Sequence, residues 1–165
     1  MTIDELNSLP REGFVEALGW VFEHSPWVAE RAWQRRPFDS VEALHRAMAD
    51  EVRGASRGEQ LALLAAHPDL GSGAKMSAAS VGEQAGAGLD RLPQEESVRL
   101  HALVAAYREK FGFPFLFAVK GSTRRDIFLA LVDRFGGDPE EEFREALRQV
   151  YRIARFRLEE TVKEA

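Results

Sequence analysis

The chain lacks cysteine, and this absence removes several kinds of chemistry at once. Disulfides, thiol catalysis and zinc sites built on thiolates are all excluded. The chain has four histidines, and no two of them stand at the spacing that lets one helix bind a metal ion through both. These residues are His24, His45, His67 and His101. We therefore expect no metal site.

Long apolar runs and an excess of positive charge are also missing. The most apolar stretch, FGFPFLFAV, is far too short to span a bilayer and contains a proline. The N-terminal MTIDELNSLPREGF has neither the basic flank nor the apolar core of a signal peptide. A net charge of −5 does not attract the phosphates of nucleic acids or anionic membranes. The sequence thus predicts a cytoplasmic protein that binds neither nucleic acid nor membrane.

Apolar residues recur at helical spacing through most of the chain, whereas strand-like alternation is almost absent. Helices are predicted directly after Ser40, Ser56 and Asp138, where a capping side chain precedes an apolar stripe. Further helices are expected over residues 27–35, 81–87, 93–111 and 122–135. With 165 residues, no internal repeat and no linker, the sequence predicts an all-α, single-domain multi-helix bundle over residues 1–165.

One segment, FPFLFAVKG at residues 113–121, does not fit the helical pattern. Its apolar run suits a buried extended stretch, and Pro114 disfavours a regular helix. We expect this part of the bundle to be an irregular apolar segment.

In LLAAHPDLGSG a helical apolar pattern runs straight into a histidine followed by a proline. Because the residue before a proline is disfavoured in a helix, His67 must lie at the C-terminal end of that helix. A cationic imidazole interacts favourably with the helix dipole there, and its pKa can be tuned for proton transfer. The alternative is a histidine that only caps the helix, and the residues alone favour that interpretation.

Two other charged side chains stand in unusual surroundings. Arg157 lies within the apolar stripe of the last helix, one turn after Ile153 and two turns after Val150. A guanidinium buried there needs an anionic or acceptor partner. A structural ion pair with a buried carboxylate, for which Glu83 is a candidate, is the alternative to substrate binding. Glu83 itself stands among small residues in SVGEQAGAG, either beside a closely approaching ligand or as a solvated acid.

The motifs FEHSPWVAERAW, LLAAHPDLG, SVGEQAGAGL, YREKFGFPFLFAVKG and RIARFRL follow one another in a specific order. In this order the chain resembles the 2-oxo-4-hydroxy-4-carboxy-5-ureidoimidazoline (OHCU) decarboxylases, from about Phe14 to Leu158. That family catalyses the last step from urate to (S)-allantoin. The resemblance implies an all-α fold, which agrees with the periodicity, and a homodimer. It also implies a cofactor-free enzyme whose partner is a small-molecule substrate, a ureidoimidazoline carboxylate.

The resemblance assigns three catalytic residues, His67 in HPDL, Glu83 in S-x-x-E-Q and Arg157 in the closing R-L. His67 would act as a general acid and base, Glu83 would orient the substrate, and Arg157 would hold an anionic group. On the same resemblance the substrate-binding residues are Pro68, Ser80, Val81, Gly82, Gln84, Phe115, Leu116, Phe117, Ala118 and Val119. The run from 115 to 119 would act mainly through its backbone groups.

A function of a different class remains open on the residues themselves. The chain could be a non-catalytic helical protein-interaction module, with Trp27, Trp33 and the FGFPFLF segment forming a partner-binding surface. Formation of enantiopure allantoin faster than its spontaneous formation distinguishes the enzyme from such a module.

Overall fold

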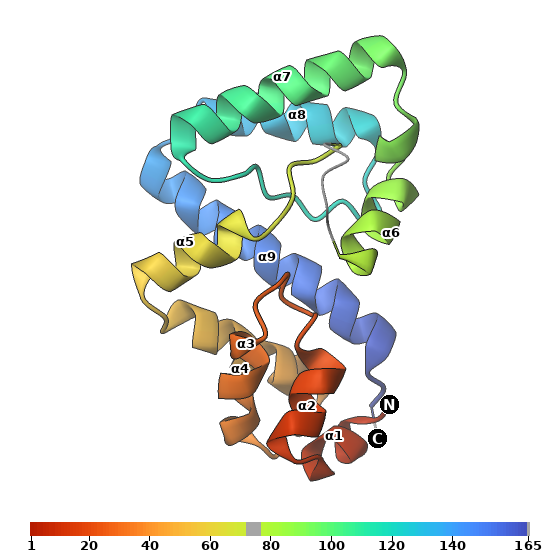
Figure 1. Ribbon diagram of the computed structural model, residues 1–165, viewed down its shortest axis with the longest axis vertical. Helices are drawn as coiled ribbons and strands as arrows, with labels where there is room; N and C mark the ends of the chain where they lie inside the picture. The colour runs from red at the N-terminus through yellow and green to blue at the C-terminus, as the bar shows by residue number, and fades with distance from the viewer. Residues whose placement is uncertain (72–76, 165) are drawn as a thin grey trace. The chain divides into compact units, whose positions relative to one another are not determined.

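The computed structural model describes residues 1–71 and 77–164, and every regular element in this part of the chain is a helix (Figure 1). The elements are α1 (Ile3–Ser8), α2 (Arg11–Leu18), α3 (Trp27–Ala32), η1 (Trp33–Arg35), α4 (Val41–Arg53), α5 (Arg57–Ala65), α6 (Ala78–Gly86), η2 (Leu89–Arg91), α7 (Gln94–Phe111), α8 (Arg124–Phe135) and α9 (Pro139–Thr161). The all-α class predicted from the periodicity is confirmed. None of the described helices is long and apolar enough to cross a membrane.

The chain divides into two compact units. The first unit comprises Met1–Ala66 together with Tyr151–Ala165, and the second unit comprises His67–Val150. The long helix α9 contributes its first half to the second unit and its second half to the first. The prediction of one domain over residues 1–165 stays a prediction.

In the first unit, capping side chains define where the helices begin. The Ser40 hydroxyl accepts a hydrogen bond from the Ala43 amide at 3.0 Å, which satisfies a free N–H group at the start of α4. At α5, Ser56 and Glu59 form a reciprocal capping box. The prediction that a helix begins directly after each of these two serines is confirmed. The amphipathic helices enclose a core whose largest fully buried side chains are Phe14, Phe22, Ile3, Leu6, Leu18, Leu44, Met48, Leu63 and Leu64.

In the second unit, the helix predicted over residues 93–111 is α7, and Gly112 ends it in the left-handed conformation at φ 81°. The helix predicted over residues 122–135 is α8, which lies side by side with α7 (Figure 1). The Asp138 carboxylate accepts hydrogen bonds from the amides of Glu140 and Glu141 and so caps α9. These predictions are correct to within two residues.

Residues 113–121 adopt no regular secondary structure, as expected from Pro114. Phe113 and Phe115 are buried and pack edge-on against the ring of Tyr107 from α7. An apolar stretch without helix or strand therefore forms part of the core of the second unit. Its backbone polar groups must find partners among side chains, because buried amides left without hydrogen bonds are costly.

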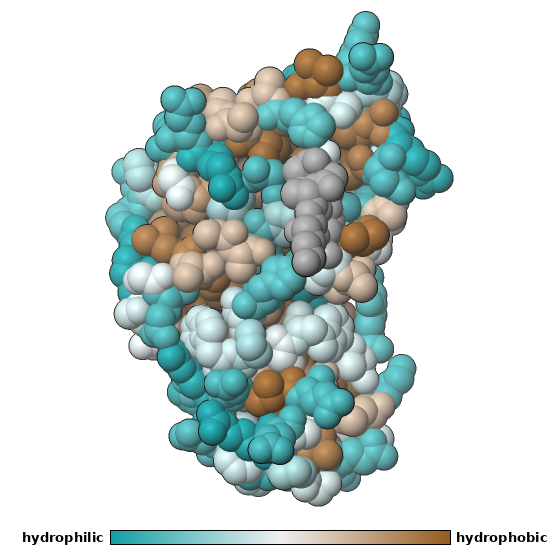
Figure 2. Space-filling view, in the orientation of Figure 1, coloured by the Kyte–Doolittle hydropathy of each residue, from teal (hydrophilic) through white to brown (hydrophobic). Residues whose placement is uncertain are grey.

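The surface proposed for a protein-interaction module is largely internal. Trp27 and Trp33 are half-buried, each with an arginine guanidinium over its ring, and most of the FGFPFLF segment is buried. On the face drawn in Figure 2, hydrophilic side chains predominate and apolar groups form small, separate patches. The described residues thus give the interaction-module hypothesis no support.

Candidate active site

His67 directly follows Ala66, the C-cap residue of α5, so the helix ends where Pro68 required it to end. The His67 side chain is only 6% exposed, whereas Pro68 is half-buried. A buried imidazole at a helix end suits proton transfer better than a solvated one would, because fixed neighbours rather than water set its surroundings. The catalytic role of His67 stays a prediction.

The loop after His67 is fastened to two helices of the second unit. The Gly71 amide donates to Gln84 Oε1 on α6 at 2.9 Å. On α7, His101 Nε2 lies 2.7 Å from the Gly71 carbonyl oxygen, and Arg108 Nε donates to Asp69 Oδ1 at 3.3 Å. The structure therefore joins the HPDLG motif directly to the S-x-x-E-Q motif.

Sequence reasoning missed the anchoring roles of His101 and Arg108. The two residues are seven apart, which places them two turns apart on one face of α7. That spacing was visible in the sequence. Their partners in the loop, Gly71 and Asp69, could not be inferred from the sequence, because they depend on where the loop packs.

Helix α6 presents the S-x-x-E-Q motif on two faces. Ser80 and Gln84, four residues apart, are 6% and 7% exposed and lie on the buried side. Glu83 is half-buried, while Val81 and Gly82 are exposed. The Ser77 hydroxyl caps the helix by accepting from the Ser80 amide. Of the predicted substrate-binding residues in this motif, the structure therefore buries two and exposes two.

A cavity of about 360 Å³ adjoins this motif and the HPDLG loop. Val81, Gln84 and Gly71 line it, and the remaining lining residues are Leu89, Asp90, Leu92 and Ser97. The volume is sufficient for a small organic ligand. The structure therefore places two predicted substrate-binding residues on one ligand-sized hollow.

Arg157 belongs to the first unit, where it is 2% exposed and paired with a buried carboxylate. Its Nη1 donates to Glu23 Oε1 at 3.2 Å and to the Val21 carbonyl oxygen at 3.2 Å. The burial expected from the apolar stripe is confirmed. The sequence had suggested Glu83 as the ion-pair partner, whereas the pair that the structure describes is formed with Glu23. The motif FEHSPW contains this residue, and a glutamate directly after the apolar Val21-Phe22 was the available sign.

The remaining predicted substrate-binding residues lie in the irregular segment of the second unit. Phe115, Leu116, Ala118 and Val119 are buried, and Phe117 is half-buried. Two of its peptide groups are bound by side chains of neighbouring helices. Arg134 donates to the Leu116 carbonyl oxygen at 2.5 Å, and Gln149 Oε1 accepts from the Ala118 amide at 3.0 Å.

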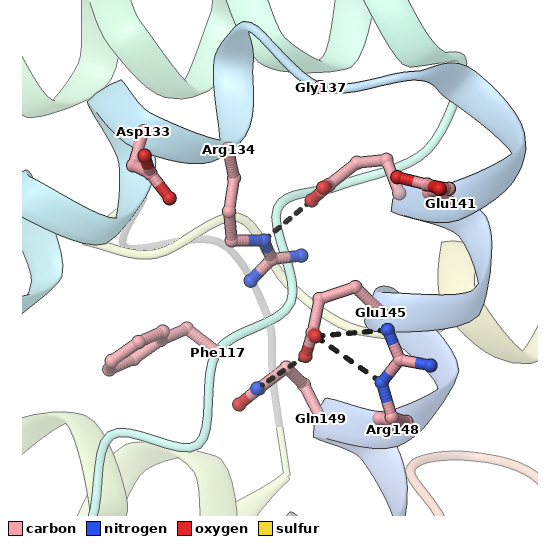
Figure 3. Close-up of a pocket in the computed structure, with 9 residues that line it drawn as sticks. Phe117, Asp133, Arg134, Gly137, Glu141, Glu145, Arg148 and Gln149 are labelled. Carbon is pink, nitrogen blue, oxygen red and sulfur yellow. Dashed lines mark hydrogen bonds and ion pairs between the residues drawn. The ribbon is translucent and has the colours of Figure 1, made fainter.

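Arg134 belongs to a charged network that sequence reasoning did not find. Arg134 Nε and the Tyr107 hydroxyl both donate to Glu142 Oε1, each at 2.5 Å. Burial, together with this hydrogen bond, raises the pKa of Tyr107 and keeps its hydroxyl protonated. The network borders a cavity of about 380 Å³ that Phe117, Arg134 and Gln149 help to line (Figure 3).

Comparison with known proteins places this arrangement in context. The family model for OHCU decarboxylase matches residues 7–159. The 2-oxo-4-hydroxy-4-carboxy-5-ureidoimidazoline decarboxylase of Halalkalicoccus jeotgali is 48% identical over 160 residues, which cover 97% of this chain and 91% of that protein. The uric acid degradation bifunctional protein PucL of Bacillus subtilis is 46% identical over 99% of this chain.

Among solved structures, that of an (S)-allantoin synthase matches with a TM-score of 0.81 and 33% identity over 98% of this chain. The present chain spans 54% of the length of that synthase and 33% of the length of the Bacillus protein. In both, the matching part is one portion of a longer polypeptide.

Proposed function

The chain belongs to the OHCU decarboxylase family, and we propose that it converts OHCU to (S)-allantoin and CO₂ in the degradation of urate. The observation that carries the proposal is the family match across residues 7–159, within which the HPDL histidine is buried at a helix end. The hydrogen bond between Gly71 and Gln84, which joins two of the motifs, supports it further.

The substrate contains its own electron sink. As its name states, C4 carries a hydroxyl and a carboxylate, and the imidazoline ring provides a C=N bond next to C4. When the C4–carboxylate bond breaks, its electron pair forms a C4=C5 bond, and the C=N pair moves to the ring nitrogen, which takes a proton. The resulting enol loses its hydroxyl proton and takes one at C5, so the overall reaction consumes one proton. We therefore propose a decarboxylase that needs no cofactor.

In this proposal His67 is the general acid and base that delivers the proton and sets the stereochemistry of allantoin. Glu83 accepts a hydrogen bond from the substrate hydroxyl or a ring N–H group. Arg157 holds an anionic group or stabilises the developing negative charge. Pro68 and the segments 80–84 and 115–119 complete the binding surface, the last mainly through backbone groups.

Two finer features belong to the same proposal. We propose that the protein forms a homodimer, as its resemblance to the family implies, and that it works in the cytoplasm. Light scattering on the protein as it elutes from a size-exclusion column should give a molar mass twice the 18.5 kDa of the chain. A monomer mass at micromolar concentration would contradict the dimer without affecting the proposed reaction.

The decisive experiment supplies freshly generated urate-oxidation intermediates to the purified protein. We expect the circular dichroism of enantiopure (S)-allantoin to appear faster than spontaneous decay produces allantoin. The rate should survive prior dialysis against a chelator, since the substrate itself accepts the electron pair. Racemic allantoin formed at the spontaneous rate would exclude the activity and favour the interaction module.

A further inference from the structure

Two buried side chains form hydrogen bonds with neighbouring peptide groups in the irregular segment 113–121 of the second unit. Arg134 of α8 donates to the Leu116 carbonyl oxygen, and Gln149 of α9 accepts from the Ala118 amide. Gln149 is 7% exposed, and the Arg134 side chain is 11% exposed. Well-buried polar groups in such contacts hold one geometry, because water does not compete for them.

The two gripped groups belong to the two peptide planes on either side of Phe117. A trans peptide is planar, with its C=O and N–H pointing in opposite directions, and the peptide bonds here are trans. Fixing the Leu116 carbonyl therefore points the Phe117 N–H away from Arg134. Fixing the Ala118 N–H likewise points the Phe117 carbonyl away from Gln149. Both backbone groups of Phe117 are thus set by side chains that bind its neighbours.

Further contacts hold the two gripping side chains in place. Glu142, which is 5% exposed, accepts from Arg134 Nε at 2.5 Å and so fixes the guanidinium plane. Gln149 Nε2 donates to Glu145 Oε2 at 2.8 Å, which sets the amide orientation so that Oε1 faces the Ala118 amide (Figure 3). Arg148 donates to the other carboxylate oxygen of Glu145.

We propose that Arg134 and Gln149 are positioning residues for the decarboxylation, acting through the peptide groups of Phe117 on an N–H and C=O pair of the substrate. A ureido group and a ring amide both offer such a pair, so a backbone donor and acceptor from one residue complement them. This inference rests on the proposed function and extends it to two residues that contact the backbone rather than the substrate.

Gln149 gives the cleaner test, because removing Arg134 would also take the cationic partner from the buried Glu142 carboxylate. Gln149→Met keeps the length and volume but lacks the strong acceptor. The Phe117 N–H and C=O groups would contribute equally to binding of the substrate and of the transition state. KM should therefore rise about tenfold in this variant, and kcat should change by no more than about threefold. The excess of (S)- over (R)-allantoin should also fall, since a loosened ring presents both faces to the proton donor.

Two further variants separate positioning from packing. Arg144→Gln replaces an exposed arginine of the same helix, α9, and should keep the wild-type KM and enantiomeric excess. The double variant Gln149→Glu, Glu145→Gln exchanges the two groups while retaining an acceptor for the Ala118 amide. It should restore KM to within about threefold of the wild-type value.

Each result decides between explanations. A folded Gln149→Met protein with unchanged KM and enantiomeric excess overturns the positioning role. If that variant does not fold, the double variant decides: wild-type KM supports the role of the acceptor, and a tenfold higher KM overturns it. An inactive wild-type protein would instead overturn the proposed function, and the positioning role with it.

Discussion

His67 is the residue on which the proposed chemistry depends most, and it is buried directly after the end of α5. Asparagine has a similar size and can still form hydrogen bonds, but it does not exchange a proton near neutral pH. We expect His67→Asn to fold normally and to lose about 100-fold or more in kcat, the range typical of a lost general acid or base. Circular dichroism and the allantoin assay measure both. A fully active variant would remove His67 from the mechanism.

Removing one partner of the buried ion pair between Arg157 and Glu23 should destabilise the first unit strongly. Glu23 is fully buried, so Glu23→Gln removes a carboxylate counter-charge from a guanidinium that is itself only 2% exposed. We expect the free energy of unfolding to fall by about 3 kcal/mol, measured by urea denaturation. The exposed pair of Arg155 and Glu159 on the same helix provides the control, and Glu159→Gln should cost about 0.5 kcal/mol or less.

The same site separates a structural arginine from a substrate-binding one. Arg157→Ala removes both the ion pair and any contact with an anionic substrate group, whereas Glu23→Gln leaves the guanidinium present. If Arg157 binds the substrate, kcat/KM should fall much further in Arg157→Ala than in Glu23→Gln. Equal and small effects on kcat/KM would leave Arg157 a purely structural role.

At this scale the sequence predicted position better than partnership. The position of His67 at a helix end followed from Pro68, and the burial of Arg157 followed from the apolar stripe, since both depend on local geometry. The partners Glu23 and Gln149 did not follow, because they lie more than thirty residues from the groups they bind. Such pairings are fixed by tertiary packing, to which periodicity is blind.

After α5 the chain has a glycine, Gly71, at a crowded point, and its lack of a side chain lets the loop pack against α7. Gly71 has φ 69°, and a Cβ atom there would lie 2.8 Å from Cδ2 of the buried Leu100. Gly112 has a similar φ of 81°, but no atom of the described residues lies within 4 Å of a Cβ added there. Gly112→Ala should therefore lose only about 1 kcal/mol from backbone strain.

In Gly71→Ala the free energy of unfolding should fall by about 1–3 kcal/mol more than in Gly112→Ala, because Leu100 or the loop must move. Since the loop begins at His67, we also expect Gly71→Ala to lower kcat/KM while Gly112→Ala leaves it unchanged. Urea denaturation and the allantoin assay measure the two effects. Equal losses of stability in the two variants would show that Leu100 does not constrain the loop.

Helices α3 and α5 are tied together by a pH-dependent ion pair. The Arg31 guanidinium, 2.5 Å from Glu59 Oε2, lowers the pKa of Glu59 to about 2 from its ordinary 4.5. Between these values the unfolded chain binds the proton more readily, so this contribution to stability is present above pH 4.5 and is lost as the pH falls towards 2. The stability of Glu59→Gln should accordingly decrease less over that interval in urea titrations. An unchanged slope would mean that the pair contributes nothing in solution.

Helix boundaries were the most predictable elements, because Ser40, Ser56 and Asp138 carry their own capping chemistry. The segment 113–121 could be recognised as irregular from Pro114, but its path could not be predicted. That path depends on the aromatic core around it and on Arg134, which lies 18 residues from the carbonyl group that it binds.

At the scale of the whole molecule, α9 is the element common to both units. Its apolar periodicity runs unbroken through Val150 and Tyr151, so no sequence pattern indicates that one unit ends between these two residues. A continuous helix carries backbone hydrogen bonds across that point. A break in the backbone there should therefore affect both units together.

Arg152 allows this to be tested, because it is exposed and lies next to the boundary between the two units. Arg152→Pro removes one helical hydrogen bond and places the ring against the carbonyl of residue 148, at a cost of about 3 kcal/mol or more. Arg152→Ala loses the same side chain without the break, and should stay within about 1 kcal/mol of wild type. The free energy of unfolding of a whole domain is only about 5–15 kcal/mol, so this loss is a large part of it. The proline variant should therefore lose activity, and backbone amides of both units should exchange hydrogen faster than in the wild type. Faster exchange confined to residues 151–161 would show instead that the second unit keeps its fold without an intact α9.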